Sequence, residues 1–193
     1  SKVIALGLRQ WILQDINIEC DIARNFAEAK EMIQRGGSDY FVSLIDLHLP
    51  DAPDGKAVDF MLQHNVPPIV VTGSYDDKAR KAMMAKDVVD FVVRRHPKDM
   101  GHLLKAIKRI FNNRSMKALV VDDSRSFRMH FKKILINQRL QVFEAEDGMQ
   151  ALRVIRANPD IKLVLTDYHM PVMDGFRLVR EIRRRYSEDR MAI

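Results

Sequence analysis

The 193-residue sequence has a single cysteine, Cys20, and no long apolar run. One cysteine cannot form an internal disulfide, so the chain fits a reducing compartment, and we expect a cytoplasmic protein. No run approaches the ~20 apolar residues that a membrane span needs. Residues 1–7 do not show a basic stretch followed by a long apolar one, so no signal peptide is expected there.

Acidic residues are fewer than basic ones, 26 against 32, and the formal net charge is +6. A basic protein could bind nucleic acid or an acidic surface. The densest basic cluster, however, shares one expected helix with apolar residues at helical spacing, which is typical of a solvated face opposite a core-facing stripe. We therefore expect no direct nucleic-acid contact from it. Its members are Arg177, Arg180, Arg183, Arg184 and Arg185.

Short apolar runs alternate with amphipathic stretches in the second half of the chain. Strands are expected at 118–121, 140–145 and 163–166, and helices after Ser124 and at 149–157 and 176–186. Ser124 is expected to cap the first of these helices. The alternation predicts a parallel sheet with helices on both faces.

The first half follows the same pattern. Strands are expected at 16–23, 40–45, 68–71 and 89–93, and helices at 26–34, 57–64, 77–86 and 100–111. Gly36-Gly37 should end the first of these helices. The polar segment 112–115 predicts a short connection between two domains, residues 1–113 and 116–193.

The two halves are an internal repeat of domain size. The loop Asp46–Gly55 matches Asp167–Gly175 with one extra residue. In this alignment the first domain lacks its first strand, and the second stops at Ile193, where its fourth strand should begin. Lys2 to Leu8 could be the missing strand, but only about two helical turns would then follow, so we favour a helix. The expected fold class is α/β, with two doubly wound parallel-sheet domains truncated at both ends.

Three carboxylates follow predicted strands: Asp122 and Asp123 after one, and Asp167 after another. Parallel sheets bind ligands beyond the carboxyl ends of their strands. Converging carboxylates repel each other, and a bound Mg²⁺ would remove this repulsion. Because a carboxylate oxygen can attack phosphorus, the set suits phosphoryl transfer to Asp167. Any one of these residues alone could be only a helix cap or a turn former.

Three motifs closely resemble the response-regulator receiver family of two-component signalling. They are Val120-Val-Asp-Asp-Ser124, Glu146-Asp-Gly148 and Leu165-Thr-Asp-Tyr-His-Met-Pro-Val-Met-Asp-Gly175. The resemblance implies a flavodoxin-like fold and a phosphoacceptor at Asp167. It also implies that Asp123, Asp167 and the backbone carbonyl of His169 bind Mg²⁺, with Asp122 holding the metal through water.

In the first domain the resemblance implies a second phosphoacceptor at Asp46, a hydroxyl residue at Thr72 and a carbonyl ligand at His48. Arg94 stands where the family has lysine, and its planar fork does not replace a compact ammonium. The acidic pair that would match Asp122-Asp123 is missing with the first strand of this domain. The sequence leaves open whether this domain is phosphorylated or only structural or dimerising.

The resemblance implies a signalling module that a sensor histidine kinase or phosphotransfer protein phosphorylates, and that controls an output domain in the same chain or a partner. Homodimer formation stays open. The alternative is the regulatory half of a diguanylate cyclase whose catalytic domain lies downstream, because this sequence contains no cyclase motif. A haloacid-dehalogenase-type phosphatase would need a second Asp two residues after the nucleophile, where His169 stands.

Overall fold

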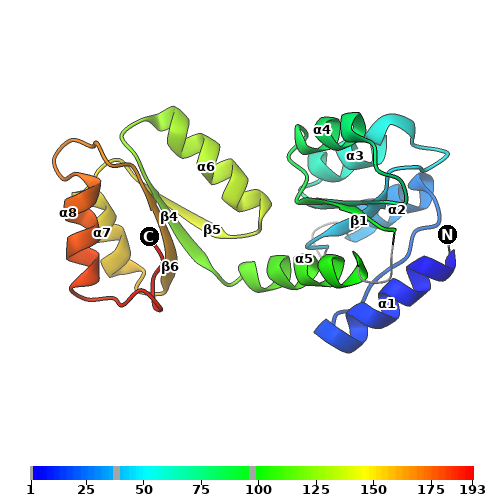
Figure 1. The fold of residues 1–193 in the computed structure, drawn as a ribbon, viewed down its shortest axis with the longest axis horizontal. Helices are drawn as coiled ribbons and strands as arrows, with labels where there is room; N and C mark the ends of the chain where they lie inside the picture. The colour runs from blue at the N-terminus through cyan, green and yellow to red at the C-terminus, as the bar shows by residue number, and fades with distance from the viewer. Residues whose placement is uncertain (1, 37–39, 96–98) are drawn as a thin grey trace. The chain divides into compact units, whose positions relative to one another are not determined.

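The structure is a computed structural model that describes residues 2–36, 40–95 and 99–193. The chain divides into two compact units, residues 1–111 and 112–193 (Figure 1). Each unit contains a three-stranded parallel sheet flanked by helices, which confirms the α/β class. Within the described ranges no helix is both long and apolar enough to cross a membrane.

In the first unit the sheet has the order β1-β2-β3, and its helices follow the predicted alternation. The predicted helix at Lys2–Leu8 is confirmed and continues to Ile16. The last helix runs to Asn113, so half of the expected polar connection is helical. The elements are α1 (Lys2–Ile16), α2 (Phe26–Gly36), β1 (Ser43–Asp46), η2 (Pro53–Gly55), α3 (Lys56–Gln63), β2 (Pro68–Thr72), α4 (Asp77–Met84), β3 (Asp90–Val93) and α5 (Asp99–Asn113).

The predicted strand at residues 16–23 is wrong. Ile16 ends α1, and residues 17–23 form no strand, although Ile18 and Cys20 contact the core. In the second unit, the strand that follows the first helix pairs only with the strand before that helix. Among the described residues of the first unit no strand corresponds to that earlier strand, and residues 17–23 pair with none of β1, β2 and β3. Gly37, part of the predicted helix stop, lies outside the described residues.

The central strand β2 is buried on both faces of its sheet. Ile69 and Val71 contact α1 and α5 on one face, through Ile12 and Leu103. On the other face, Val70 belongs to a core with residues of α2 and α3. This burial explains why the strand reads as a continuous apolar run rather than an alternating one.

The second unit has all the predicted elements, with ends that differ by a few residues. Its sheet order is β5-β4-β6, with every pairing parallel. Ala192 also forms a parallel bridge with Leu163 of β6, where the next strand was expected. The elements are β4 (Lys117–Val121), α6 (Arg125–Asn137), β5 (Gln141–Ala145), α7 (Gly148–Ala157), β6 (Ile161–Thr166) and α8 (Gly175–Arg183).

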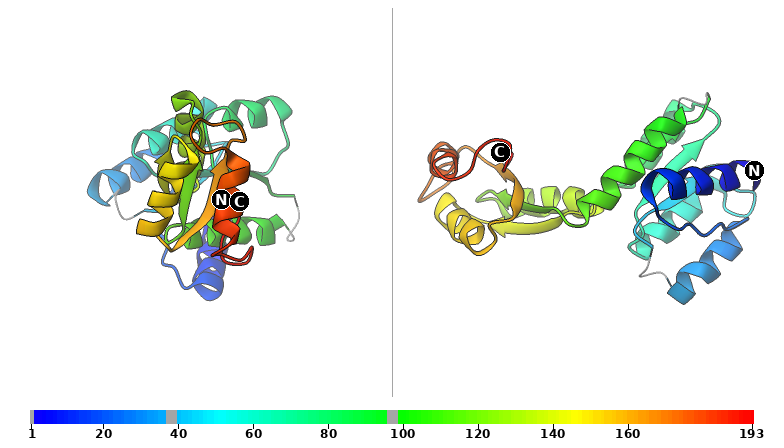
Figure 2. Two further views of the ribbon diagram at one scale, coloured as in Figure 1. Left: turned by 90° about the vertical axis from the view of Figure 1, so that its left-hand side faces the viewer. Right: turned by 90° about the horizontal axis from the view of Figure 1, so that it is seen from below.

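The two faces of this second sheet are covered differently. Figures 1 and 2 show α7 and α8 together on one side of the sheet and α6 on the other. Leu119 and Val121 contact buried residues of α7 and α8, including Ile155 and Leu178. On the opposite face, Ala118 and Val120 form a smaller core with Leu135 of α6. Five large apolar side chains of α6 remain exposed: Phe127, Met129, Phe131, Ile134 and Ile136.

Candidate functional site

The predicted acidic residues come together at one edge of the second sheet. Val121, the last residue of β4, is in register with Thr166, the last residue of β6. The backbone N–H of Asp167 donates to the Val121 carbonyl at 2.9 Å. Asp122 and Asp123 therefore follow one strand and Asp167 follows its neighbour. The central strand β4 has β5 on one side and β6 on the other, so the chain reverses its winding direction at β4. Parallel sheets bind ligands at such a topological switch point, beyond the carboxyl ends of the strands.

The loop that follows Asp167 is held closely to the strand end. The N–H of His169 donates to the Asp167 carboxylate at 3.2 Å, and the N–H of Gly175 donates to the Tyr168 carbonyl at 3.0 Å. A side chain at Gly175 would place its Cβ 2.2 Å from the Asp167 carbonyl oxygen, so only glycine fits. Val172 has φ of 66°, a left-handed conformation that is rare for a β-branched residue.

Asp122 organises the turn between β4 and α6. Its carboxylate accepts a hydrogen bond of 2.8 Å from the N–H of Ser124. Ser124 occupies the N-cap position, but its side chain makes no capping hydrogen bond, so the predicted capping role is wrong. Asp122 and an arginine of α6 organise this turn in its place.

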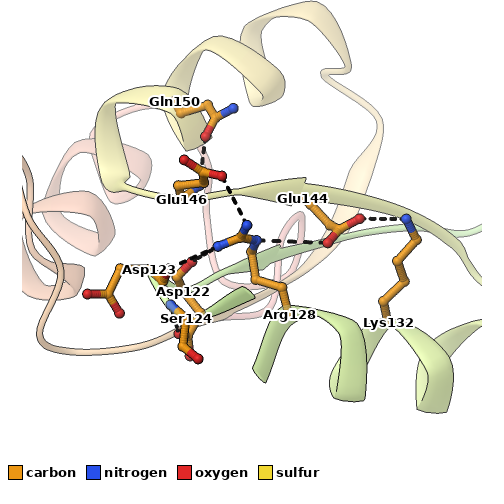
Figure 3. A network of polar contacts seen from close by, with 8 residues as sticks. All are labelled: Asp122, Asp123, Ser124, Arg128, Lys132, Glu144, Glu146 and Gln150. Carbon is orange, nitrogen blue, oxygen red and sulfur yellow. Dashed lines mark hydrogen bonds and ion pairs between the residues drawn. The ribbon is translucent and has the colours of Figure 1, made fainter. Parts of the chain in front are cut away.

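That arginine is Arg128, which was not predicted. It is buried, with 7% of its surface exposed. Its Nη1 donates to the carbonyl oxygens of Asp122 and Asp123 at 2.8 and 3.1 Å (Figure 3). Its Nη2 donates to Glu146 at 3.0 Å. In the sequence, Arg128 reads as one more basic residue on a helix surface, and only the extended polar network of the fold distinguishes it.

The donor set at this edge fits Mg²⁺. Within the described residues, no group of three or more His, Cys, Asp or Glu side chains is placed to hold one metal ion. Mg²⁺ does not require such a group, because it keeps several waters and needs only one or two carboxylates. Asp123 and Asp167 are both exposed and follow adjacent strands, so they could supply these carboxylates.

The first unit gathers a related but different set of residues. Asp46 ends β1 and is exposed, and its carboxylate accepts the N–H of His48 at 3.0 Å. Thr72 ends the neighbouring strand β2, is buried, and exchanges hydrogen bonds with the backbone of Ser74. The Arg94 N–H donates to the Thr72 carbonyl at 2.7 Å. The side-chain Nε of Arg94 is buried and has no hydrogen-bond partner in the described part of the chain.

Comparison with known proteins agrees with this geometry. The family model of the response regulator receiver domain matches residues 118–193. The solved structure of a two-component system response regulator/GGDEF domain protein is 35% identical to this chain, with a TM-score of 0.81 over 98% of this chain and 78% of that one. The chain belongs to the response regulator receiver family.

Other relatives of this receiver chain point the same way. A chemotaxis protein CheY homolog of Campylobacter jejuni is 41% identical over 81 residues, and chemotaxis protein CheY1 of Helicobacter pylori is 44% identical over 69. The matches cover 40% and 35% of the receiver chain, and the chain spans 61% and 56% of these relatives. A second response regulator/GGDEF structure is 36% identical over 97% of this chain and 77% of that one, with a TM-score of 0.80.

Proposed function

We propose that this receiver chain is the phosphoacceptor of a two-component relay, with Asp167 as the modified residue. The observation that supports this most is the register of Val121 with Thr166, which aligns the acidic pair with Asp167 on adjacent strands. The phosphoryl donor would be a sensor histidine kinase or a phosphotransfer protein. The reaction would take place in the cytoplasm, and the aspartyl phosphate would control an output domain or a partner.

In the proposed reaction a carboxylate oxygen of Asp167 attacks the phosphorus atom of a phosphohistidine. The new O–P bond forms as the P–N bond breaks, and the electron pair of that bond stays on the leaving imidazole nitrogen. Asp123 and Asp167, with the carbonyl of His169, would hold Mg²⁺, and Asp122 would hold it through water. The metal, when bound, neutralises charge that develops on the phosphoryl oxygens.

The test is incorporation of phosphate from acetyl phosphate, a small donor that needs no partner protein. The intact chain should be labelled at Asp167 only when Mg²⁺ is present, and Asp167→Asn should abolish the label. Asp123→Ala should weaken metal binding because it removes a carboxylate ligand. If Asp167→Asn is labelled at the rate of the wild type, the assignment of the phosphoacceptor is wrong.

The same experiment addresses the first unit, which we propose to be a receiver-like domain with weak or no phosphorylation. In it Arg94 stands where the family has lysine, and its planar fork does not replace a compact ammonium. Peptide mapping should therefore find the label mainly at Asp167. Label mainly at Asp46 would overturn this assignment. Label at similar rates on both residues would show that Arg94 serves in place of lysine.

A second candidate function is regulation of a diguanylate cyclase. Two solved structures described as response regulator/GGDEF domain proteins align with nearly the whole of this chain. We infer that the longer protein includes a cyclase domain downstream of Ile193, controlled by the receiver. Reading the gene downstream is the direct test, and an open reading frame with no cyclase domain would reject this candidate.

A further inference from the structure

Arg128 is unusual among the basic residues of this chain. Among the charged residues that the structure describes, only Arg128 is buried. Burying a charge is costly unless partners replace its water. Arg128 lies one turn into α6, directly behind the end of β4, and all its described partners are polar groups of the second unit (Figure 3). An arginine needed only for a soluble surface would not be enclosed in this way.

The guanidinium bonds to the backbone of the acidic pair and not to its carboxylates. Nη1 donates to the carbonyl oxygens of Asp122 and of Asp123. These two bonds fix the peptide planes after each aspartate, and with them the direction in which each side chain leaves the backbone. In Figure 3 the Asp123 carboxylate points away from the guanidinium, so it remains available to a ligand.

Two glutamates hold the guanidinium from the other side. Glu146, in the turn after β5, accepts from Nη2 at 3.0 Å, and Glu144 of β5 lies 3.8 Å from Nε. Lys132 forms an ion pair with the same Glu144. The N–H of Glu146 donates to Gln150 at 2.7 Å, which ties this turn to α7. Arg128 is therefore fixed by β5 and its turn while it holds the end of β4.

We propose that Arg128 is a positioning residue for the metal site. It holds the Asp122-Asp123 backbone so that the Asp123 carboxylate faces the edge where Asp167 lies. This inference rests on the proposed function, because it assumes that these carboxylates bind Mg²⁺. Residues that orient metal ligands without touching the metal commonly change metal affinity by about 10- to 100-fold when they are replaced.

The charge of Arg128 and its positioning role have opposite effects on metal binding, which makes the inference testable. A positive charge near the site repels Mg²⁺, so loss of the charge alone would tighten metal binding. Loss of the two carbonyl hydrogen bonds would free the acidic turn and weaken metal binding. The sign of the change therefore separates the two effects.

The experiment is titration of the 193-residue chain with Mg²⁺, followed by calorimetry and by the amide NMR signals of Asp123 and Ser124. Arg128→Met should weaken Mg²⁺ binding about tenfold or more, and Arg128→Lys should fall between Arg128→Met and the wild type. Lys132→Met is the matched control. It removes a cation from the same network but leaves the carbonyl oxygens of the acidic pair untouched, and its affinity should stay within twofold.

The outcomes separate the two proposals. If the wild-type chain binds no Mg²⁺, the proposed function fails. If the wild type binds Mg²⁺ and Arg128→Met binds it equally or more tightly, the positioning role is rejected. An equal loss in Lys132→Met would also reject it, because disturbance of the shared Glu144 network, and not loss of the two carbonyl hydrogen bonds, would then explain both variants. If Arg128→Met does not fold, Glu146→Gln takes its place, because Glu146 is exposed and holds the guanidinium. This substitution should lower the Mg²⁺ affinity a few-fold. An unchanged Mg²⁺ affinity would reject the positioning role of Arg128.

Discussion

Val172 takes a left-handed backbone conformation in the loop beside Asp167, and its side chain is 75% exposed. An L-residue with a Cβ pays roughly 1–2 kcal/mol for this conformation, and a β-branched one gains little from contacts at such exposure. Val172→Gly should therefore raise the free energy of unfolding by about 1 kcal/mol, measured in urea. Val172→Ala keeps a Cβ and should gain less, so an equal gain for both variants would contradict this explanation.

Gly175 should respond in the opposite direction. A Cβ there would lie 2.2 Å from the Asp167 carbonyl oxygen, a backbone atom that cannot move without disturbing the site. Gly175→Ala should lower the free energy of unfolding by about 2 kcal/mol or more. Gly101 in α5 is the control, since no atom within 4 Å would meet its Cβ and alanine favours helix by about 0.5–1 kcal/mol. A tolerated Gly175→Ala would mean that the loop can move.

At the residue scale, the sequence predicted the groups whose chemistry is local. Asp122, Asp123 and Asp167 were recognisable because each directly follows an apolar strand, and the structure places them at one sheet edge. Arg128 was not recognisable, because its role depends on Glu144 and Glu146 of another strand and turn. Helical spacing alone cannot distinguish a buried arginine from a solvated one. The capping role of Ser124 was wrong, because its side chain accepts no hydrogen bond from the first turn of α6.

At the scale of elements, Lys117 links the start of β4 to the turn before β6 through its hydrogen bond of 3.0 Å to Asp160. This hydrogen bond, more than any other cause, lowers the pKa of Asp160. Lys117→Met should raise the pKa of Asp160 toward its ordinary value of about 3.9, as measured by NMR of the carboxyl carbon. The charge of Lys162 lowers the pKa of Asp160 less than the hydrogen bond from Lys117 does, so Lys162→Met should raise this pKa by a smaller amount.

The lowered pKa of Asp160 determines how the stability contributed by the Lys117–Asp160 contact depends on pH. The ionised form is favoured in the folded chain, so the contribution is present above about pH 4 and is lost as the pH falls through the folded value. The difference in stability between the wild type and Lys117→Met should therefore close in acid. A difference that persists at low pH would show that Lys117 acts through packing and not through Asp160.

The elements themselves were predictable wherever a strand has a partner within the chain. Strands β2 and β4 were clear from sequence because burial on both faces gives continuous apolar runs. Residues 16–23 have an equally strand-like composition, but composition cannot supply the neighbouring strand that the hydrogen bonds require. Sheet formation is a property of pairs of segments, and this prediction considered one segment alone.

For the whole molecule, the two units contain separate hydrophobic cores in the described residues, since each buried cluster lies within one unit. Leu178 is fully buried in α8, so Leu178→Ala should lower the free energy of unfolding of the second unit by about 2–5 kcal/mol. Hydrogen exchange should accelerate in peptides of residues 117–193, while the fluorescence of Trp11, the only tryptophan, should report an unchanged first unit.

Leu103→Ala provides the reciprocal variant. Leu103 is fully buried in α5, within the core that contains Ile12, next to Trp11 in the sequence. Leu103→Ala should shift the unfolding transition that Trp11 fluorescence reports to milder denaturing conditions. Hydrogen exchange in residues 117–193 should stay unchanged. If either substitution destabilises both units equally, the two cores unfold as one cooperative structure. The repeat of Asp46–Gly55 and Asp167–Gly175 indicated from the sequence that the chain has two units, and the structure divides it at about residue 111.

Cys20 gives the first unit a chemical handle that the second unit does not have. It is the only cysteine of the chain, half-buried within the segment 17–23, which forms no strand. Burial, as the main cause, raises the pKa of its thiol, so alkylation in the folded state should be slow at neutral pH and should accelerate where this segment opens. The rate of alkylation by a thiol reagent therefore measures how often the segment 17–23 opens to solvent.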